Sequence, residues 1–158
     1  MTYRTVFDAA QNGFAAWWVP AFSFIFVLLS AGIVMGLPGL RWGQRSPVSD
    51  RFALGFTVLL TLLAFGVTFA DYRGAVSKLR HGKYEIVNGP VTHFTKLPKW
   101  GWQKAETFVV DGHRFTYYGY IVSAGFHQMA SQGGPIHDGL YVRVTYSGSE
   151  ILRLEIAQ

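Results

Sequence analysis

Cysteine is absent from this 158-residue sequence, and charged residues are scarce. Without cysteine the chain has no disulfide framework, no thiolate metal site and no cysteine nucleophile. Asp, Glu, Lys and Arg make up 15% of the residues, whereas an average soluble domain has about 25%. The first half of the chain is the poorer in charge, because two long apolar segments lie there, and this argues against one soluble globular domain.

Residues 52–70 form one of these apolar segments, with nineteen consecutive residues and no charge. As a helix, which rises about 1.5 Å per residue, it would be about 28 Å long, close to the roughly 30 Å hydrocarbon core of a bilayer. Residues 14–36 predict a second span, with Trp17 and Trp18 at one end and Trp42 beyond the other. Neither span contains an ionisable residue, which argues against a transporter or a proton path.

Small residues on the two spans predict that they pack as an antiparallel hairpin. Gly32 and Gly36 would allow close approach on the first span. The second span has small or weakly polar residues on one helical face: Thr57, Thr61, Ala64 and Thr68. A homodimer face is the alternative interpretation of the same residues, so a homo-oligomer stays open.

The basic excess of the chain lies beside the spans. Residues 1–83 contain eight Lys and Arg against three Asp, whereas residues 84–158 contain six of each sign. Basic residues in such flanks set topology and contact anionic lipid. Five of them (Arg4, Arg73, Lys78, Arg80, Lys83) flank the termini and three (Arg41, Arg45, Arg51) lie in the connector. This predicts cytoplasmic termini in a bacterial inner membrane, and the neutral second half argues against binding to nucleic acid.

Residues 71–82 link the second span to the rest of the chain. Tyr72, Val76 and Leu79 would share one helical face there. A short helix lying in the headgroup region and a solvated extension of the second span both fit this pattern.

Alternating apolar residues predict a soluble β domain over 84–158, after a membrane hairpin domain over 1–83. We expect five strands, at 84–96 with an interruption at 88–90, 105–110, 114–122, 140–146 and 150–156. Asp111-Gly112 indicates a hairpin turn. Five short strands cannot bury two separate sheets, so the predicted fold is α+β, with a two-helix transmembrane hairpin followed by a small five-stranded antiparallel β-barrel, OB-like or SH3-like.

The last hairpin predicts a register with a chemical consequence. Pairing Tyr146 with Glu150 places Arg143 opposite Arg153, which is unfavourable unless an acid or an anion lies between them. Glu155, diagonal to Arg143, is the simpler partner, and Arg143 with Arg153 is a candidate anion site.

The end of the chain resembles a known family. Residues 135–139 (PIHDG), 141–144 (YVRV) and 151–155 (ILRLE) resemble the last strands of NfeD-type membrane proteins. The resemblance covers about the last quarter of the chain. It implies membrane spans followed by a C-terminal OB-like domain, and a link to stomatin-like protein partners.

The polar cluster of greatest interest is His113, His127, His137 and Asp138, three of them in or beside the long connection 123–139. Together they are a candidate ligand or metal site, since imidazole and carboxylate groups bind zinc. Their spacing matches no H-x-x-x-H or H-E-x-x-H motif, so no metal or other cofactor is predicted. Ser131 adds a hydroxyl to His137 and Asp138, but no G-x-S-x-G elbow presents a nucleophile, and no catalytic residue is predicted.

The sequence therefore predicts a non-catalytic accessory or scaffold protein of the membrane, whose β-barrel domain binds a protein partner at the lipid surface. A ligand- or metal-sensing role for the 123–139 loop is the alternative. A membrane-bound enzyme using His137 and Asp138 is a third class.

Overall fold

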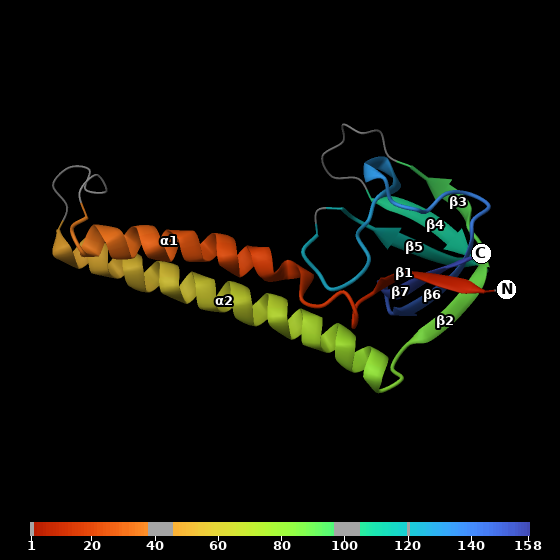
Figure 1. Ribbon diagram of the computed structural model, residues 1–158, viewed down its shortest axis with the longest axis horizontal. Coiled ribbons are helices and arrows are strands. Elements are labelled where there is room, and N and C mark those ends of the chain that lie inside the picture. Colours follow the sequence, from red (N-terminus) through yellow and green to blue (C-terminus); the bar gives the residue numbers. More distant parts are fainter. Residues whose placement is uncertain (1, 38–45, 97–104, 120) are drawn as a thin grey trace. The chain divides into compact units, whose positions relative to one another are not determined.

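A computed structural model describes residues 2–37, 46–96, 105–119 and 121–158. The chain forms two compact units, one of Met1–Gly13 with Tyr72–Gln158, the other of Phe14–Asp71. The first unit contains all the strands, so it is built from both ends of the chain. The helical unit is inserted between these two parts in the sequence (Figure 1). Residues 1–13, which the sequence analysis placed with the membrane hairpin, thus belong with the strands.

The helical unit contains η1 (Ala15–Trp17), α1 (Trp18–Val34) and the first part of α2 (Pro47–Arg80). Figure 1 shows α1 and α2 running antiparallel side by side. The hydroxyl of Thr57 lies 3.5 Å from that of Ser30 across the pair, and Gly32 is the buried residue of α1. The residues of the predicted contact face of α2 are half-buried, whereas most residues around them on the helix are exposed; the face consists of Thr57, Thr61, Ala64 and Thr68. The predicted antiparallel pair with Gly32 and Thr57 at the contact is confirmed, but Gly36 lies past the end of α1 and is exposed, so it does not contribute to the packing.

Helix α2 continues without a break to Arg80, ten residues past the predicted span. Of the two interpretations of residues 71–82, the extension of the second span is therefore correct. One side of this extension is not solvated, because Ala75 is 1% exposed and packs with Leu79 against the core of the β unit. Gly82, with φ of 66°, lies just beyond the end of the helix, in the left-handed conformation typical of that position.

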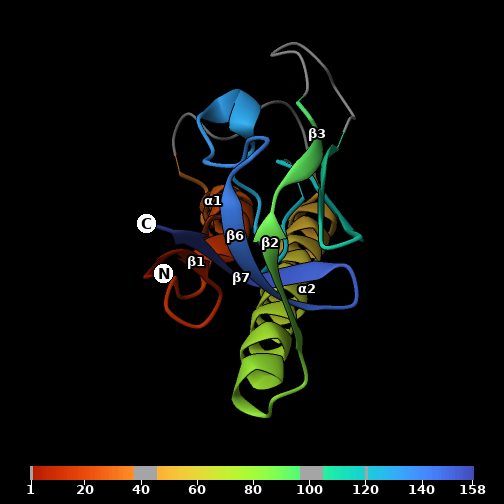
Figure 2. The same cartoon turned by 90° about the vertical axis from the view of Figure 1, so that its right-hand side faces the viewer.

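The strands form two antiparallel sheets. The first, in the order β1-β7-β6-β2, consists of β1 (Tyr3–Asp8), β7 (Glu150–Ala157), β6 (Tyr141–Ser147) and β2 (Glu85–Pro90). The second, in the order β3-β4-β5, consists of β3 (Thr92–Thr95), β4 (Glu106–Val110) and β5 (His113–Tyr117). Figure 2 shows β6 and β2 of the first sheet side by side.

The predicted five-stranded barrel is wrong, since the described strands form sheets of four and three strands that do not close into a barrel. All five predicted strands exist, but the first one breaks after Pro90 and supplies β2 to one sheet and β3 to the other. The sequence analysis also missed β1, which pairs with β7 from Tyr3↔Ala157 to Asp8↔Arg153. β1 is the fourth strand of the first sheet. It lies outside residues 84–158, so the predicted barrel could not contain it.

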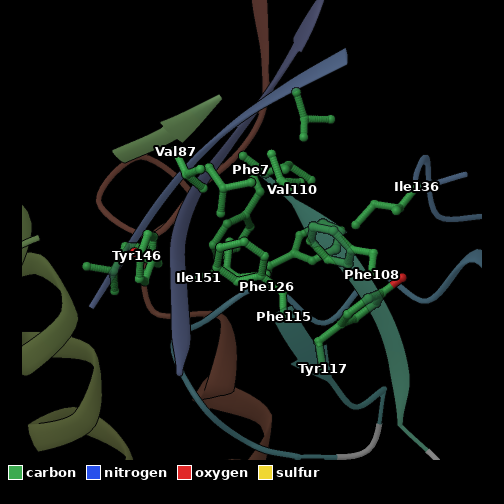
Figure 3. Packing of buried hydrophobic residues seen from close by; sticks show 14 of the residues in the cluster. Phe7, Val87, Phe108, Val110, Phe115, Tyr117, Phe126, Ile136, Tyr146 and Ile151 are labelled. Carbon is green, nitrogen blue, oxygen red and sulfur yellow. The ribbon is translucent and has the colours of Figure 1, made fainter. Parts of the chain in front are cut away.

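The core of the β unit lies between the two sheets and is rich in aromatic rings (Figure 3). Phe126 belongs to the connection between β5 and β6, and its ring lies 5.7 Å from that of Phe7 and 5.4 Å from that of Tyr117. Met129 and Ile136 of the same connection are also buried. Each such side chain contributes about 1.5–3 kcal/mol when fully buried. The connection therefore completes the core instead of extending freely into solvent.

The two hairpins differ in how well the sequence predicts them. Asp111 and Gly112 form the predicted turn, with two residues and φ of 47° and 78°. In the last hairpin Tyr146 pairs with Ile151, not with Glu150, and a register shift follows, so that Thr145 pairs with Arg153. Leu152 is the extra residue of this β-bulge. The bulge restores the predicted apolar face but places Arg143 opposite Glu155.

Candidate functional site

The three histidines predicted as ligands lie apart. His113 begins β5, with Nδ1 3.3 Å from the hydroxyl of Tyr146. The ring of His127 contacts Ser123 and Tyr118, and Nδ1 of His137 lies 3.0 Å from the backbone oxygen of Asp138. Among the described residues, no three His, Cys, Asp or Glu side chains are grouped so that they could hold a metal ion. The structure does not bring this candidate site together.

Asp138 fastens the end of the 123–139 loop to β3. Its Oδ1 accepts a hydrogen bond of 2.9 Å from the backbone N–H of Phe94. The neighbouring Gly139 donates its N–H to the carbonyl of Val91, and Val91 donates to the carbonyl of Leu140, each at 2.8 Å. Asp138 and the two residues after it thus hold the end of the loop against β3 and against Val91, the residue between β2 and β3.

The predicted pairing of Arg143 with Arg153 is wrong, because the turn pairs Ser147 with Glu150 and the β-bulge adds one more residue to the shift in register. Arg143 lies 3.9 Å from Glu155, the simpler partner, and its guanidinium stacks 3.9 Å above the ring of Tyr3. Nε of Arg153 donates to Oδ2 of Asp8 at 2.7 Å. Both cations are therefore neutralised by acids of the chain, and the candidate anion site loses its geometric basis.

Glu106 is the most notable polar residue of the β unit, and the sequence analysis missed it. Its side chain is fully buried, at 0% exposure. Oε2 accepts the hydroxyl proton of Tyr117 at 2.6 Å and the N–H of Ala130 at 2.7 Å, and Oε1 accepts the N–H of Ser131 at 3.0 Å. Glu106 shares one face of β4 with Phe108 and Val110, since the three are two residues apart along the strand. That spacing is the sequence signal that places this acid on the buried face.

The carboxyl of Glu106 is held in its charged form. Burial raises its pKa, but the hydrogen bonds from Tyr117, Ala130 and Ser131 outweigh burial, so the pKa of Glu106 lies below its usual value. The opposite applies to Tyr117, since burial and the bond to Glu106 raise the pKa of its hydroxyl. The pair is therefore a carboxylate and a neutral phenol.

Glu106 serves as a cap for a turn that is distant in the sequence. The short 3₁₀ helix η2 (Ala130–Gln132) begins after Met129, whose side chain makes no capping hydrogen bond. The first N–H groups of a helix need acceptors. Glu106 supplies them from β4, 24 residues before Ala130.

A glycine fixes the path of the same loop. A Cβ at Gly134 would lie 2.1 Å from the carbonyl oxygen of Gln128, because the chain crosses itself there. The N–H of Gly134 donates to the carbonyl of Met129 at 2.8 Å, and Gly133 has φ of 94°. Phe126 and Ile136 lie in the core, and Glu106 accepts hydrogen bonds from the loop backbone. These contacts fix the path of the loop.

Ser123 and His127 form the hydroxyl–imidazole contact of this loop. Nδ1 of His127 lies 2.7 Å from the carbonyl oxygen of Tyr118, so Nδ1 carries the proton and Nε2 accepts from the Ser123 hydroxyl at 2.6 Å. A hydroxyl bonded to imidazole is one element of nucleophile activation. Here a backbone carbonyl replaces the orienting carboxylate, and Gly125 donates its N–H to the hydroxyl oxygen at 3.4 Å. These bonds brace the loop internally.

The helical unit has the reverse of the usual surface pattern. Its large apolar side chains face outward, with Leu62 64% and Val67 69% exposed, and Phe22 and Leu28 similarly exposed. Among the described residues two helical segments, Ala15–Val34 and Pro47–Arg80, are long and apolar enough to cross a bilayer, by length and composition. Their contact face is formed by small residues.

Comparisons with protein-family models, with curated proteins and with solved structures find no match to this chain.

Proposed function

We propose that the chain is an integral membrane protein with two spans, which acts as an accessory or scaffold protein and holds a β interaction domain at the lipid surface. The observation that carries the proposal is the outward apolar surface of α1 and α2. Leu62 and Val67 are exposed, whereas Thr57, which contacts Ser30 of α1, and Thr61 are half-buried. In water this distribution is unfavourable, since large apolar surfaces are exposed, whereas in hydrocarbon it is the expected one.

The sheet topology supports an even number of crossings. β1 precedes α1 in the sequence and pairs with β7, which follows α2. A chain that forms this pairing must enter and leave the membrane on the same side. Two spans satisfy this requirement, and one span does not.

A charge substitution distinguishes a bilayer from water. Leu62→Arg places a charge on the outer face of α2, which costs about 2.5–3.5 kcal/mol at the centre of a membrane helix. We expect the variant to be depleted from the membrane fraction of expressing cells. Arg51→Leu, a control at a flank, should remain in the membrane. A Leu62→Arg chain that stays in the membrane like the parent would contradict the proposed spans.

A protein partner is the proposed ligand of the β domain, as the resemblance to NfeD-type proteins also implies. β2 ends the strand order of its sheet among the described residues, and Ile86 on this strand is 55% exposed. Edge strands with exposed apolar side chains are places where another chain can pair. A photoreactive amino acid at Ile86 should crosslink a discrete protein in cells, while the same group at Gln128 of the loop should not. No crosslink from Ile86 would count against a protein partner at this edge.

The side of the membrane follows from basic residues near the spans. Five Lys and Arg residues flank the termini, and three lie in the predicted connector between the spans. Residues 38–45 of this connector are outside the described residues. This distribution favours the β domain in the cytoplasm of a bacterial inner membrane. Reporter proteins fused after Gln158 test this. Alkaline phosphatase is active only outside the cytoplasm, whereas a fluorescent protein is active inside it. We expect the fluorescent fusion to be active and the phosphatase fusion to be inactive.

A further inference from the structure

Ser123 and His127 form a polarised hydroxyl–imidazole pair in the connection between β5 and β6. Because the carbonyl oxygen of Tyr118 accepts the Nδ1 proton of His127 at 2.7 Å, Nε2 is the acceptor of the Ser123 hydroxyl at 2.6 Å. This is the tautomer that a general base needs, since the nitrogen facing the hydroxyl must take its proton. Both side chains are half-buried, so the pair is not sealed in the core.

A second serine–histidine pair with the same spacing of four residues has the opposite geometry. The hydroxyl of Ser77 on α2 lies 3.2 Å from Nδ1 of His81, and that nitrogen lies 2.9 Å from the carbonyl oxygen of Ser77. A carbonyl oxygen can only accept, so Nδ1 of His81 carries the proton. This nitrogen is therefore no base for the Ser77 hydroxyl, and the chain contains its own comparison for the pair at Ser123.

The backbone around Ser123 is fixed by contacts with the rest of the β unit. On one side the N–H of Phe126 donates to the carbonyl of Ile151 in β7 at 3.1 Å. On the other side a side chain at Gly119 would collide with the buried Met129. The hydroxyl and the imidazole are thus positioned before any ligand binds. Such positioning lowers the barrier of a reaction, because less orientational freedom is lost on reaching the transition state.

Two features beside Ser123 define the chemistry of a ligand. Ile121 and Val122 precede it and are each 41% exposed, so they present apolar surface next to the hydroxyl. The N–H of Gly125 points to the Ser123 oxygen from 3.4 Å. It can donate to the negative oxygen that forms when a neighbouring carbonyl is attacked. An uncharged ester with an apolar acyl chain fits both features.

We propose that Ser123 is a nucleophile that takes the acyl group of such an ester, with His127 as its general base. Oγ of Ser123 bonds to the carbonyl carbon while its proton passes to Nε2 of His127. The bond between this carbon and the alcohol oxygen then breaks, and the alcohol leaves with the proton.

Water completes the reaction through the same nitrogen. It gives a proton to Nε2 of His127 as its oxygen bonds to the acyl carbon, the carboxylic acid leaves, and the proton returns to Ser123. The net reaction converts an ester and water into an acid and an alcohol. This activity goes beyond the scaffold role and does not depend on the membrane spans.

The test is covalent labelling of the full chain in detergent with a fluorophosphonate that carries an octyl chain. Its phosphorus takes the place of the acyl carbon. We expect mass spectrometry to find the label on Ser123 and not on Ser77 of the same molecules. His127→Gln should slow labelling by at least about 100-fold, the lower range for general base catalysis, whereas Ser77→Ala should leave it unchanged. An unlabelled Ser123, or equal labelling of the two serines, would overturn the proposal.

Turnover separates a nucleophile from a pair that only braces the loop. The chain should hydrolyse p-nitrophenyl octanoate with a kcat/KM at least about tenfold above that of p-nitrophenyl acetate, because Ile121 and Val122 contact the longer chain. The rate should rise with pH as His127 becomes neutral, and Ser123→Ala should abolish it. Hydrolysis by Ser123→Ala at the wild-type rate would contradict the assignment.

A thiol replaces the hydroxyl if His127→Gln does not fold, as judged by near-ultraviolet circular dichroism. The sequence has no cysteine, so Ser123→Cys and Ser77→Cys each carry a single thiol. A thiol beside an imidazole base loses its proton more easily and reacts faster. We expect iodoacetamide to modify Ser123→Cys at least about tenfold faster than Ser77→Cys at about pH 6.5. Equal rates would show that His127 does not act as the base.

Discussion

Tyr117 donates its hydroxyl proton to the fully buried carboxylate of Glu106 at 2.6 Å, and the same carboxylate accepts two backbone N–H groups of the loop that covers the core. A buried charge without partners would be strongly unfavourable. Three hydrogen-bond donors stabilise the charge of Glu106, and these bonds connect β4 to β5 and to the loop.

Replacing Glu106 should destabilise the β unit. Glu106→Gln keeps the shape but loses the charge, and its amide N–H₂ would face an N–H donor of the loop. We expect a loss of about 1–3 kcal/mol in the free energy of unfolding, the range for a buried donor or acceptor left unsatisfied. Thermal unfolding in detergent, followed by near-ultraviolet circular dichroism, measures the change. Glu155→Gln, which alters a partly exposed ion pair, should cost less than about 1 kcal/mol.

Acid should weaken the fold through the same residue. The pKa of Glu106 is lowered in the folded chain, so its contribution is present above the ordinary carboxyl pKa and is lost as pH falls through the lowered value. We expect the melting temperature of the wild type to fall more steeply below about pH 4.5 than that of Glu106→Gln. Parallel curves for the two proteins would show that Glu106 does not titrate as described.

Alkali should act through the tyrosines. Burial and the hydrogen bond to Glu106 raise the pKa of Tyr117, and the hydrogen bond to Glu85, with burial, raises the pKa of Tyr146. Because these hydroxyls ionise more easily in the unfolded chain, stability is lost as pH rises above about 10. Tyr117→Phe should make the loss shallower, although it lowers stability at neutral pH. Ultraviolet absorbance of phenolate during titration gives the ionisation directly, and normal ionisation of both tyrosines near their ordinary pKa would contradict the prediction.

Gly134 should tolerate no side chain. In Gly134→Ala the new Cβ would lie 2.1 Å from the backbone oxygen of Gln128, so the loop must move away from η2. We expect a loss of about 1–3 kcal/mol, typical of forced overpacking. Gly74→Ala is the control, because a Cβ there meets nothing within 4 Å and Gly74 lies within α2. It should be neutral or stabilise by up to about 1 kcal/mol.

Local patterns predicted the elements that depend on neighbouring residues. Asp111-Gly112 specifies its turn by backbone conformation alone, and Thr57 to Thr68 mark the helix face by spacing. Elements that depend on distant partners were missed. Tyr3–Asp8 is short and mixed in polarity, and its last residue forms an ion pair 145 positions away, with Arg153. No nearby residue indicates that pairing.

The predicted arginine pair was wrong, and the buried Glu106 was missed, for two different physical reasons. The β-bulge at Leu152 cannot be located by alternation, because Ile151 and Leu152 are both apolar and both buried. Together with the turn that pairs Ser147 with Glu150, the bulge shifted the register by two residues and removed the arginine pair. Glu106 was overlooked because an acid is rarely expected on a buried strand face. The donors that satisfy it at Ala130 and Ser131 come from a segment whose path only the folded chain defines.

The central claim is that α1 and α2 cross a lipid bilayer, and extraction of cell membranes with alkaline carbonate tests it most directly. Carbonate releases peripheral and soluble proteins but leaves proteins whose helices span the hydrocarbon. We predict that the full chain stays in the pellet after carbonate and enters solution only with detergent. Quantitative release of the chain by carbonate without detergent would contradict the account.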